Sequence, residues 1–521
     1  MLNRGAIDKI KISELFIGKA DGLKEAQEKN FEELFYTGNN TYKELVEDKT
    51  KFIISGKKGT GKTILAKYFE LEQNKNKIPT RLLTDRDVVL KQFIETGKID
   101  LDNSQRELFI EYTILTEVGK LIIENKKQAF SSCNIFKWCR LMQKINYIQK
   151  IVNERTPVDN FYSPSYDLNE KLSDKIFGEA SIKKDTSVSS GLEIIAEQET
   201  RKTFIKNPFY NILEKLKECV KFILQYMSVN LIFDDLDEYD DIITGNEKYI
   251  GFFNDFIKVT NRINSDIYCS ETKCSRVIII IRSDMLQPLN NASKNLNKII
   301  ADGQIKLNWI KKVSKGRTHP LMELIITKIK NSNPLLKNLN DEEIISRFFC
   351  ETVKGIPLIN YMLNASFGRP RDIINMLNVI IDYNKNATKF TSKYFQQTRK
   401  DYSELFLNEL RNELASHFSS EQIEECLWII KKINKNEFWL SELSQIIYTY
   451  GTDLKYYKTE REFYKFAYEF GIIGNVWHSM DEKGNQCKGY SWKYREDGRD
   501  IPDETQKFCL HFALSNALIH K

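Results

Sequence analysis

The chain has 521 residues, 41% of them hydrophobic, and it carries 78 lysines and arginines against 72 aspartates and glutamates. At roughly 100–200 residues per domain this length predicts two to four domains, and the hydrophobic fraction is high enough for each to form a core. These figures exclude a disordered chain. The net charge of +6 is small for so many charged side chains. Composition therefore gives no support to a general polycationic mode of nucleic-acid binding, and any basic site must be local.

The nine cysteines form no C-x-x-C pair, and the five histidines show neither H-E-x-x-H nor zinc-finger spacing. We therefore expect reduced thiols and no structural zinc. The first ten residues carry charges where a signal peptide needs an apolar stretch, and no apolar run reaches the ~18 residues that a membrane span requires. These features predict a cytoplasmic protein with no membrane partner.

Hydrophobic periodicity predicts an N-terminal helical lead-in over residues 1–48, and apolar β-branched runs predict strands further along. The expected strands are residues 51–55, 228–233, 277–281 and 304–309. The expected fold class is α/β: a parallel-sheet core with a large helical insert, a helical lid and a C-terminal winged-helix domain. The expected boundaries are 1–48 for the lead-in, 49–310 for the core with its mostly helical insert 85–226, 311–400 for the lid and 401–521 for the winged helix.

A glycine-rich octapeptide follows the first predicted strand and precedes a helical run, which is the context that a phosphate-binding P-loop requires. It fits G-x-x-x-x-G-K-[ST] at every fixed position, and glycines there let backbone N–H groups point at phosphate oxygens. We expect Lys62 to reach the β- and γ-phosphates and the Thr63 hydroxyl to bind Mg²⁺, which makes the core a P-loop NTPase core. The expected nucleotide-binding residues of this segment are Gly56, Lys57, Lys58, Gly59, Thr60, Gly61, Lys62, Thr63 and Ile64.

Four carboxylates gather within five residues at the end of the strand 228–233. We expect Asp234 to hold Mg²⁺, because an NTPase needs a carboxylate at the end of a neighbouring strand. Asp235 occupies the position of a base for the attacking water, and Glu238 is the substitute base. The alternative is that the carboxylates after Asp234 form a solvated acidic turn that caps the next helix.

Two further arginine positions are candidates for sensing the nucleotide. Arg282 closes the strand 277–281 and would lie beside the γ-phosphate if that strand lies between the P-loop strand and the Asp234 strand. Arg369 or Arg371, at the start of a predicted lid helix, would reach the nucleotide from the lid. A plain helix cap is the alternative for that segment, because Asp372 favours the positive end of a helix.

Four segments in fixed order resemble motifs of a known family: Gly-Lys-Lys-Gly-Thr-Gly-Lys-Thr, Phe-Asp-Asp-Leu-Asp, Ile-Ile-Ile-Arg-Ser-Asp and Gly-Arg-Pro-Arg-Asp. They are similar to the AAA+/STAND division of P-loop ATPases and, more narrowly, to bacterial P-loop ATPases linked to mobile elements and anti-phage defence. The resemblance covers roughly residues 20–521. It implies a sensor role for Arg282 and a lid-sensor role for Arg369 or Arg371. No glutamate directly follows Asp234, which leaves the identity of the hydrolytic base open.

ATP is expected as the nucleotide rather than GTP. A GTPase requires an N-K-x-D motif after the Mg²⁺-binding strand, and the nearest lookalike, residues 97–100, precedes that strand.

Two segments could contact a partner. Residues 290–317 hold seven lysines and arginines against one acid. They form either a solvated face or a surface that contacts the phosphates of a nucleic acid. The family resemblance implies that this segment approaches a neighbouring subunit's nucleotide, with Arg317 or Lys298 acting in trans. Helices at 421–433, 440–449 and 459–470, followed by a hairpin, predict the winged helix, and its slightly acidic composition favours packing on the core or a partner over DNA reading. Trp477 and Trp492 are expected to face each other across the hairpin as core residues.

The sequence therefore predicts an ATPase that acts as a molecular switch with ATP and Mg²⁺ as its ligands. We expect a homo-oligomer and a protein effector encoded nearby, with DNA or RNA contact through 290–317 or the wing as a further option. The alternative function is a nucleotide-stabilised regulator that binds DNA or a partner and hydrolyses ATP weakly or not at all.

Overall fold

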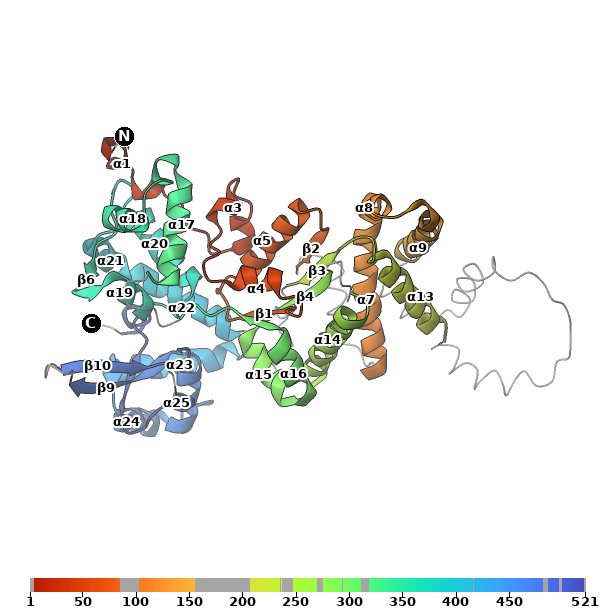
Figure 1. Ribbon diagram of the computed structural model, residues 1–521. Helices are drawn as coiled ribbons and strands as arrows, with labels where there is room; N and C mark the ends of the chain where they lie inside the picture. The colour runs from red at the N-terminus through yellow and green to blue at the C-terminus, as the bar shows by residue number, and fades with distance from the viewer. Residues whose placement is uncertain are drawn as a thin grey trace.

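The computed structural model places a parallel sheet between the helices of residues 103–223 and those of residues 320–518 (Figure 1). The residues that it describes are 4–84, 103–154, 207–234, 236, 247–268, 275–292, 294–310, 318–415, 417–480, 486–495 and 499–519.

The core is a five-stranded parallel sheet with the order β2-β3-β4-β1-β5. The strands are β1 (Ile53–Gly56), β2 (Thr80–Leu83), β3 (Asn230–Phe233), β4 (Arg276–Arg282) and β5 (Gln304–Lys306). Strand β4 pairs with both β1 and β3, with Ile279 opposite Ile53 on one side and Phe233 on the other. The position that the Arg282 prediction required is therefore confirmed, and Gly56 lies opposite Arg282 in register.

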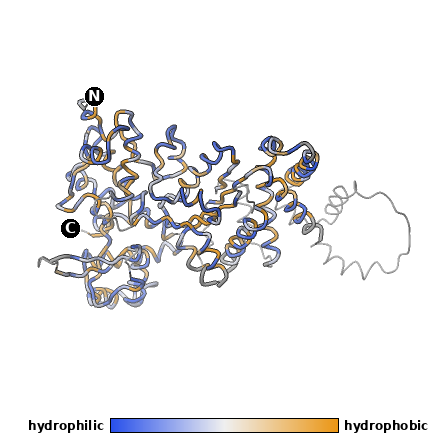
Figure 2. The backbone as a smooth tube through the Cα atoms, viewed as in Figure 1, coloured by the Kyte–Doolittle hydropathy of each residue, from blue (hydrophilic) through white to orange (hydrophobic). Residues whose placement is uncertain are grey.

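Both faces of the sheet are buried, which explains the near-continuous apolar sequence of its strands. Ile278 and Ile280 pack against α5 (Lys62–Lys75), whereas Ile279 and Ile281 pack on the opposite side against α14 (Glu247–Asp266). Figure 2 shows hydrophobic residues concentrated along these strands. Each fully buried aliphatic side chain contributes about 1.5–3 kcal/mol, so alternating residues attach a helical layer to each face.

Two sets of helices cover the sheet. The set on the α5 face includes α2 (Gly22–Glu25), α3 (Phe31–Leu34) and α4 (Thr41–Glu47). The other set comprises α14 with α7 (Asn103–Glu124), α8 (Lys126–Ser131), α9 (Ile135–Glu154), α13 (Asn207–Ile223), α15 (Ser283–Ala292) and α16 (Lys294–Gly303). The described part of the predicted insert is helical, as expected.

The helices of residues 320–397, for which we keep the name lid from the predicted segment, share one continuous core with the C-terminal part. Its helices are α17 (Pro320–Ser332), α18 (Asp341–Phe348), α19 (Leu358–Asn364), α20 (Pro370–Tyr383), α21 (Ser392–Gln397), α22 (Arg399–Ala415), α23 (Ser420–Ile433), α24 (Leu440–Tyr450), α25 (Glu460–Glu469) and α26 (Ser515–Leu518). Residues 7–17 belong to this core, while Leu23 and Leu45 pack on the sheet side. The predicted lead-in thus packs partly on the parallel sheet and partly on the core of the lid and the C-terminal part.

An antiparallel sheet completes the C-terminal part, with the order β10-β9-β11-β8. Its strands are β8 (Glu437–Phe438), β9 (Ile473–Met480), β10 (Gln486–Ser491) and β11 (Lys507–Leu510). The sequence patterns predicted the hairpin but missed β2, β8 and β11, as well as the short antiparallel pair β6 (Thr352–Val353) and β7 (Ile356–Pro357). These strands are only two to four residues long, too short for a periodic signal.

The expected pairing of Trp477 with Trp492 is wrong. The register places Trp477 opposite Gly489, whose missing side chain makes room for the indole ring. Trp492 is fully buried, whereas Trp477 is 37% exposed. One side of the hairpin therefore contributes to the core and the other does not.

The basic residues of the predicted contact segments are only partly described. Lys298 and Lys306 are exposed, and residues 311–317, including Arg317, lie outside the described part of the chain. On the wing, Lys488 pairs with Glu437 at 2.5 Å and Lys493 with Asp500 at 3.0 Å. Within the described ranges, no helix is both long and apolar enough to cross a membrane.

His511 is buried where the lid meets the C-terminal sheet. The backbone N–H of Ala513 donates to its Nδ1 atom at 3.2 Å, so Nε2 carries the proton of the neutral ring and faces the Tyr494 hydroxyl at 3.1 Å. Phe406 stacks on the ring. Burial, aided by the charge of Arg495, lowers the pKa of His511 to about 3.

We expect Ile279→Ala to lower the free energy of unfolding by about 2–5 kcal/mol, because it leaves a cavity at the centre of the sheet. Chemical denaturation measures the change. Tyr448→Ala is the control, since Tyr448 is 92% exposed and such surface changes stay within about 0.5 kcal/mol. Equal effects of the two substitutions would contradict the assigned core.

Acidification below pH 6.5 should destabilise the protein through His511. The unfolded histidine binds a proton near its ordinary pKa of about 6.5 while the folded one does not, so stability is present above that pH and is lost as the pH falls. Between pH 7.5 and 5.5 the loss is about 1.4 kcal/mol. Chemical denaturation of wild type and of His511→Gln at both pH values measures this loss of unfolding free energy. The loss should be smaller in the variant, and an equal loss in both proteins would refute this origin.

Candidate functional site

A cavity of about 710 Å³ opens where β1, β3 and β4 end at their carboxyl ends. Its lining comes from residues of the N-terminal segment 19–41, the glycine loop (residues 56–63) with the start of α5, the lid helices α17 and α20, and α22. Asp234 after β3, Arg282 of β4, and Leu307 and Trp309 after β5 complete it. Crevices at the carboxyl ends of parallel strands are where open α/β sheets bind ligands.

The glycine loop has the conformation that its glycines permit. Gly59 and Gly61 have φ angles of +81° and +93°, a region that residues with a Cβ rarely adopt. Trp309 fixes the loop by donating its indole N–H to the Thr60 carbonyl at 2.8 Å. Helix α5 begins at Lys62, so its first N–H groups, which have no acceptor within the helix, and its positive end face the loop. This is a general anion site.

The predicted loop residues divide into two groups. Those that line the cavity are Lys58, Gly59, Gly61, Lys62, Thr63 and Ile64. Gly56, Lys57 and Thr60 build the loop instead: the Thr60 hydroxyl donates to the Lys57 carbonyl at 2.8 Å. The Lys57 ammonium lies 6.0 Å from the centre of the Tyr494 ring, and burial lowers its pKa.

Lys62 crosses the loop. Its ammonium donates to the carbonyls of Gly56 and Lys57 at 3.0 and 3.1 Å. A lysine in this position brings a positive charge to the cavity wall while its flexible stem leaves it able to reach a ligand.

Asp234 follows β3 and lines the cavity together with Thr63. It is 2% exposed, and its backbone N–H donates to the Leu83 carbonyl at 2.9 Å. The carboxylate and the hydroxyl are hard oxygen donors of the type that Mg²⁺ prefers. No cluster of three or more His, Cys, Asp or Glu suited to a metal occurs in the described ranges. Asp235 and Glu238 lie outside them.

Arg282 lines the same cavity and also touches the C-terminal part. Its guanidinium donates to Asp284 at 2.5 and 3.2 Å and lies 3.3 Å from His417 Nε2, on the connection after α22. His417 contacts the Asp284 carboxylate at 2.8 Å. Burial alone would raise the pKa of Asp284, but His417 and Arg282 outweigh it and hold that pKa well below its ordinary value.

The two lid arginines have different surroundings. Arg369 is 4% exposed, binds Asp372 through two hydrogen bonds of 3.1 Å, and donates to Glu413 at 2.7 Å and to the Lys58 carbonyl at 3.0 Å. These carboxylates raise its pKa against the opposing effect of burial. Arg369 thus ties the lid to the glycine loop and is not among the cavity-lining residues.

Arg371 does line the cavity. It donates to the Ala20 carbonyl at 3.1 Å and lies 3.5 Å from the Glu409 carboxylate of α22. Its pairing is longer and more exposed than that of Arg369. Of the two predicted candidates, Arg371 is therefore the one placed to reach a ligand.

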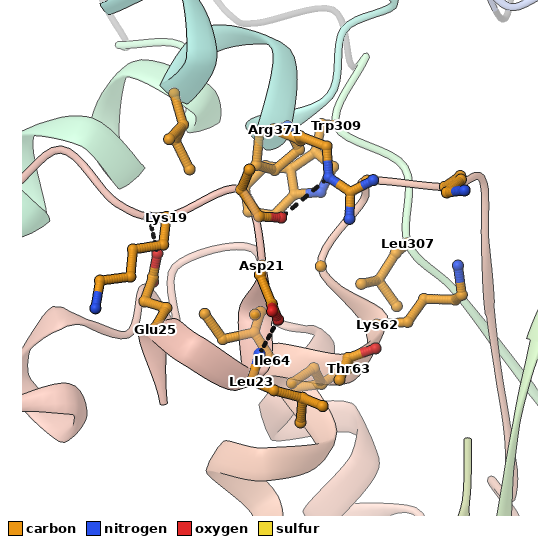
Figure 3. Close-up of a pocket in the computed structure, with 18 of the residues that line it drawn as sticks. Lys19, Asp21, Leu23, Glu25, Lys62, Thr63, Ile64, Leu307, Trp309 and Arg371 are labelled. Atoms are coloured by element: carbon orange, nitrogen blue, oxygen red, sulfur yellow. Dashed lines mark hydrogen bonds between the residues drawn. The ribbon is translucent and has the colours of Figure 1, made fainter. Parts of the chain in front are cut away.

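The end of the cavity opposite the glycine loop was not predicted. Figure 3 shows Lys62 and Thr63 at one side of the view and Lys19 and Glu25 at the other. Glu25 is 1% exposed and pairs with Lys328 of α17, which is 3% exposed. Glu25 also accepts from the Lys19 backbone N–H at 2.8 Å. A signal for this pair is absent from local sequence, because 303 positions separate its members.

The cavity lining is rich in charge. It includes six lysines and arginines, namely Lys19, Lys58, Lys62, Arg282, Lys328 and Arg371, and four acids, namely Asp21, Glu25, Asp234 and Glu409. The positive excess lies near the glycine loop and Arg371, which suits an elongated ligand with an anionic end.

Residues 319–411 match the family model of the FunZ-associated C-terminal helical domain. This range contains α17 to α21 and most of α22, which together carry Lys328, Arg371 and Glu409. No curated protein matches the chain.

The two lid arginines should respond differently to truncation. Arg369→Ala leaves Asp372 and Glu413 buried without their cation, so we expect a loss of about 3–5 kcal/mol of unfolding free energy. Arg371→Ala breaks a longer, partly exposed pair and should cost at most about 1 kcal/mol. Thermal and chemical denaturation compare the two variants, and a larger loss in Arg371→Ala would contradict the assigned burial.

Proposed function

We propose that the protein is an ATP-binding and ATP-hydrolysing switch of the AAA+/STAND type, with a P-loop NTPase core, a lid and a C-terminal winged helix. One observation carries the proposal: the glycine loop, Asp234 and Arg282 border the same cavity at the carboxyl ends of adjacent parallel strands. These are the groups that phosphoryl-transfer sites combine for positioning and for charge stabilisation.

ATP would lie along the cavity with its phosphates at the glycine loop. Lys62 and the N–H groups at the start of α5 would bind the β- and γ-phosphates, with Arg371 approaching from the lid and Arg282 from β4. The base would lie toward Ile64 and Ile374, which are apolar members of the lining. Glu25 and Lys328 would then face the polar edge of the base.

Thr63 and Asp234 would hold Mg²⁺, directly or through water. When bound, Mg²⁺ neutralises charge on the β- and γ-phosphates and orients them. Asp235, or Glu238 as its substitute, would position the attacking water.

The C-terminal part would follow the state of the nucleotide. Arg371 contacts Glu409, Arg369 contacts Glu413, and Arg282 contacts His417. All three partners lie on α22 or directly after it, so a γ-phosphate that attracts Arg371 or Arg282 would compete with contacts that fix the C-terminal part. The helix–strand–helix–helix–hairpin order of residues 420–491 supports the winged-helix assignment.

The output that we propose is control of self-assembly or of a protein effector encoded nearby, in bacterial anti-phage defence. This part of the proposal is supported by the resemblance of the motifs.

ATP binding and hydrolysis by purified protein test the proposal. Lys62→Ala should lower kcat/KM for ATP by about 100-fold or more, because it removes a charged donor aimed at the phosphates. Asp234→Asn should retain nucleotide binding but lose Mg²⁺-dependent hydrolysis. Lys67→Ala is the matched control, since Lys67 lies on the same helix and pairs with Glu70 at 2.7 Å outside the cavity lining.

Three results would separate the alternatives. Binding of ATP with no hydrolysis by wild type would favour the nucleotide-stabilised regulator. Much tighter binding of GTP analogues than of ATP analogues would refute ATP as the ligand. Comparison of Asp235→Asn with Glu238→Gln in the same assay identifies the base.

A further inference from the structure

One helical hairpin carries a high density of positive charge. Residues 126–153, which span α8 and nearly all of α9, contain six lysines and arginines and no aspartate or glutamate. Their net charge of +6 equals that of the whole chain of 521 residues. The remainder of the protein is therefore neutral in sum. Residues 290–317 carry the same net charge, but they include one acid, whereas the hairpin includes none.

The packing of the hairpin directs this charge outward. Leu141, Ile145 and Ile148 of α9 are buried against α7 and α13. Lys137 and Arg140 lie on the exposed side of the same helix. The exposed Lys126 and Lys127 of α8 extend the basic surface. We call these basic side chains, together with Lys144 and Trp138, the α8–α9 surface.

Among the described residues, no acid forms an ion pair with the cations of this surface. The ion pairs formed among the described residues include none of Lys126, Lys127, Lys137, Arg140 and Lys144. The acids of the adjacent helix α13 are few: Glu214 pairs with Lys217 at 2.8 Å, and Glu218 is exposed. A positive potential thus extends from the hairpin into solvent.

Aromatic rings are interleaved with the cations. The Arg140 guanidinium and the Lys144 ammonium lie 5.1 and 5.3 Å from the centre of the Phe222 ring of α13, contacts that fix the cations at the surface. Trp138 is 44% exposed although it packs against Phe130 at 5.3 Å between ring centres. A large flat ring beside unpaired cations is the combination found where proteins bind unpaired nucleotides.

We propose that the α8–α9 surface binds single-stranded nucleic acid, with Lys137, Arg140 and Lys144 against the phosphates and a base stacked on Trp138. A lipid surface fits less well, because Trp138 is the one large hydrophobic side chain of the described part of the hairpin that is strongly exposed, and insertion into a membrane needs a wider apolar face. DNA and RNA present the same phosphodiester and base chemistry, so the test includes both.

This surface is separate from the nucleotide cavity. None of the cavity-lining residues belongs to α8, α9 or α13, and Figure 1 shows these helices on the side of the sheet away from α23–α25. Variants of the hairpin should therefore leave ATP binding unchanged. Nucleic-acid binding at this surface does not depend on ATP hydrolysis in the cavity.

Fluorescence anisotropy with labelled 30-nucleotide oligo(dT) and oligo(U) tests the proposal on the full chain over a series of salt concentrations. Lys137→Gln combined with Arg140→Gln should weaken binding about tenfold or more at low salt. It should also make the slope of log K against log salt shallower by about 1.4, since each lost phosphate contact contributes about 0.7 for single strands.

Trp138→Ala should weaken single-strand binding about fivefold or more with little change in the salt slope, whereas Trp138→Phe should restore most of the affinity because it keeps a stacking ring. The charge-matched control is Lys298→Gln combined with Lys306→Gln, since both lysines are exposed outside the hairpin. Its binding should equal that of wild type.

Three results would overturn the proposal. The first is no binding of either oligonucleotide by wild type at low salt. The second is an equal or larger loss in the Lys298/Lys306 control, which would assign the contact to residues 290–317 instead. The third is binding of phosphatidylserine vesicles without binding of oligonucleotides, which would assign the surface to a membrane. Circular dichroism of each variant verifies that the fold is retained.

Discussion

The contact between the glycine loop and the start of α20 is the constraint on which the other features of the site depend. Arg369 donates to the Lys58 carbonyl, and the Arg371 backbone N–H approaches the Gly59 carbonyl at 3.4 Å. A Cβ on Gly59 would lie 3.1 Å from the Arg371 Cβ, so glycine is needed for close approach as well as for its φ angle. Because the lid rests directly on this backbone, the positions of Arg371, Ile374 and α22 follow from it.

Burial divides the charged groups around the cavity into structural and available ones. Arg369 is enclosed by two carboxylates, and exchanging them for a ligand would leave both acids buried without a cation. Arg371 has one longer ion pair and a backbone carbonyl, which water or a phosphate replaces at little cost. The same comparison separates Lys57, which faces Tyr494, from Lys62 at the cavity wall. In each pair, two residues of the same type and close in sequence have different roles because their packing differs.

Local sequence predicted the features that depend on local geometry. The loop 56–63, the strands around it and the β4 position of Arg282 follow from motif spacing and from apolar runs in a parallel sheet. Features that depend on tertiary contact had no such signal: Glu25 meets Lys328, and His417 meets Asp284, across more than a hundred residues. The error at Trp477 came from strand register, since pairing fixes which residues face each other, and a hairpin pattern alone does not specify it.

The N-terminal residues contact a segment that is distant from them in the sequence. The Ile12 backbone N–H donates to the Ala387 carbonyl at 2.8 Å, and the Ser13 hydroxyl donates to the Lys385 carbonyl at 2.7 Å. During synthesis these residues must wait for more than 370 others, which at about 5–20 residues per second is roughly 20–70 s. Residues 19–41, which line the cavity, remain without their lid partners for that time. The cavity can therefore be completed only after α22 has been synthesised.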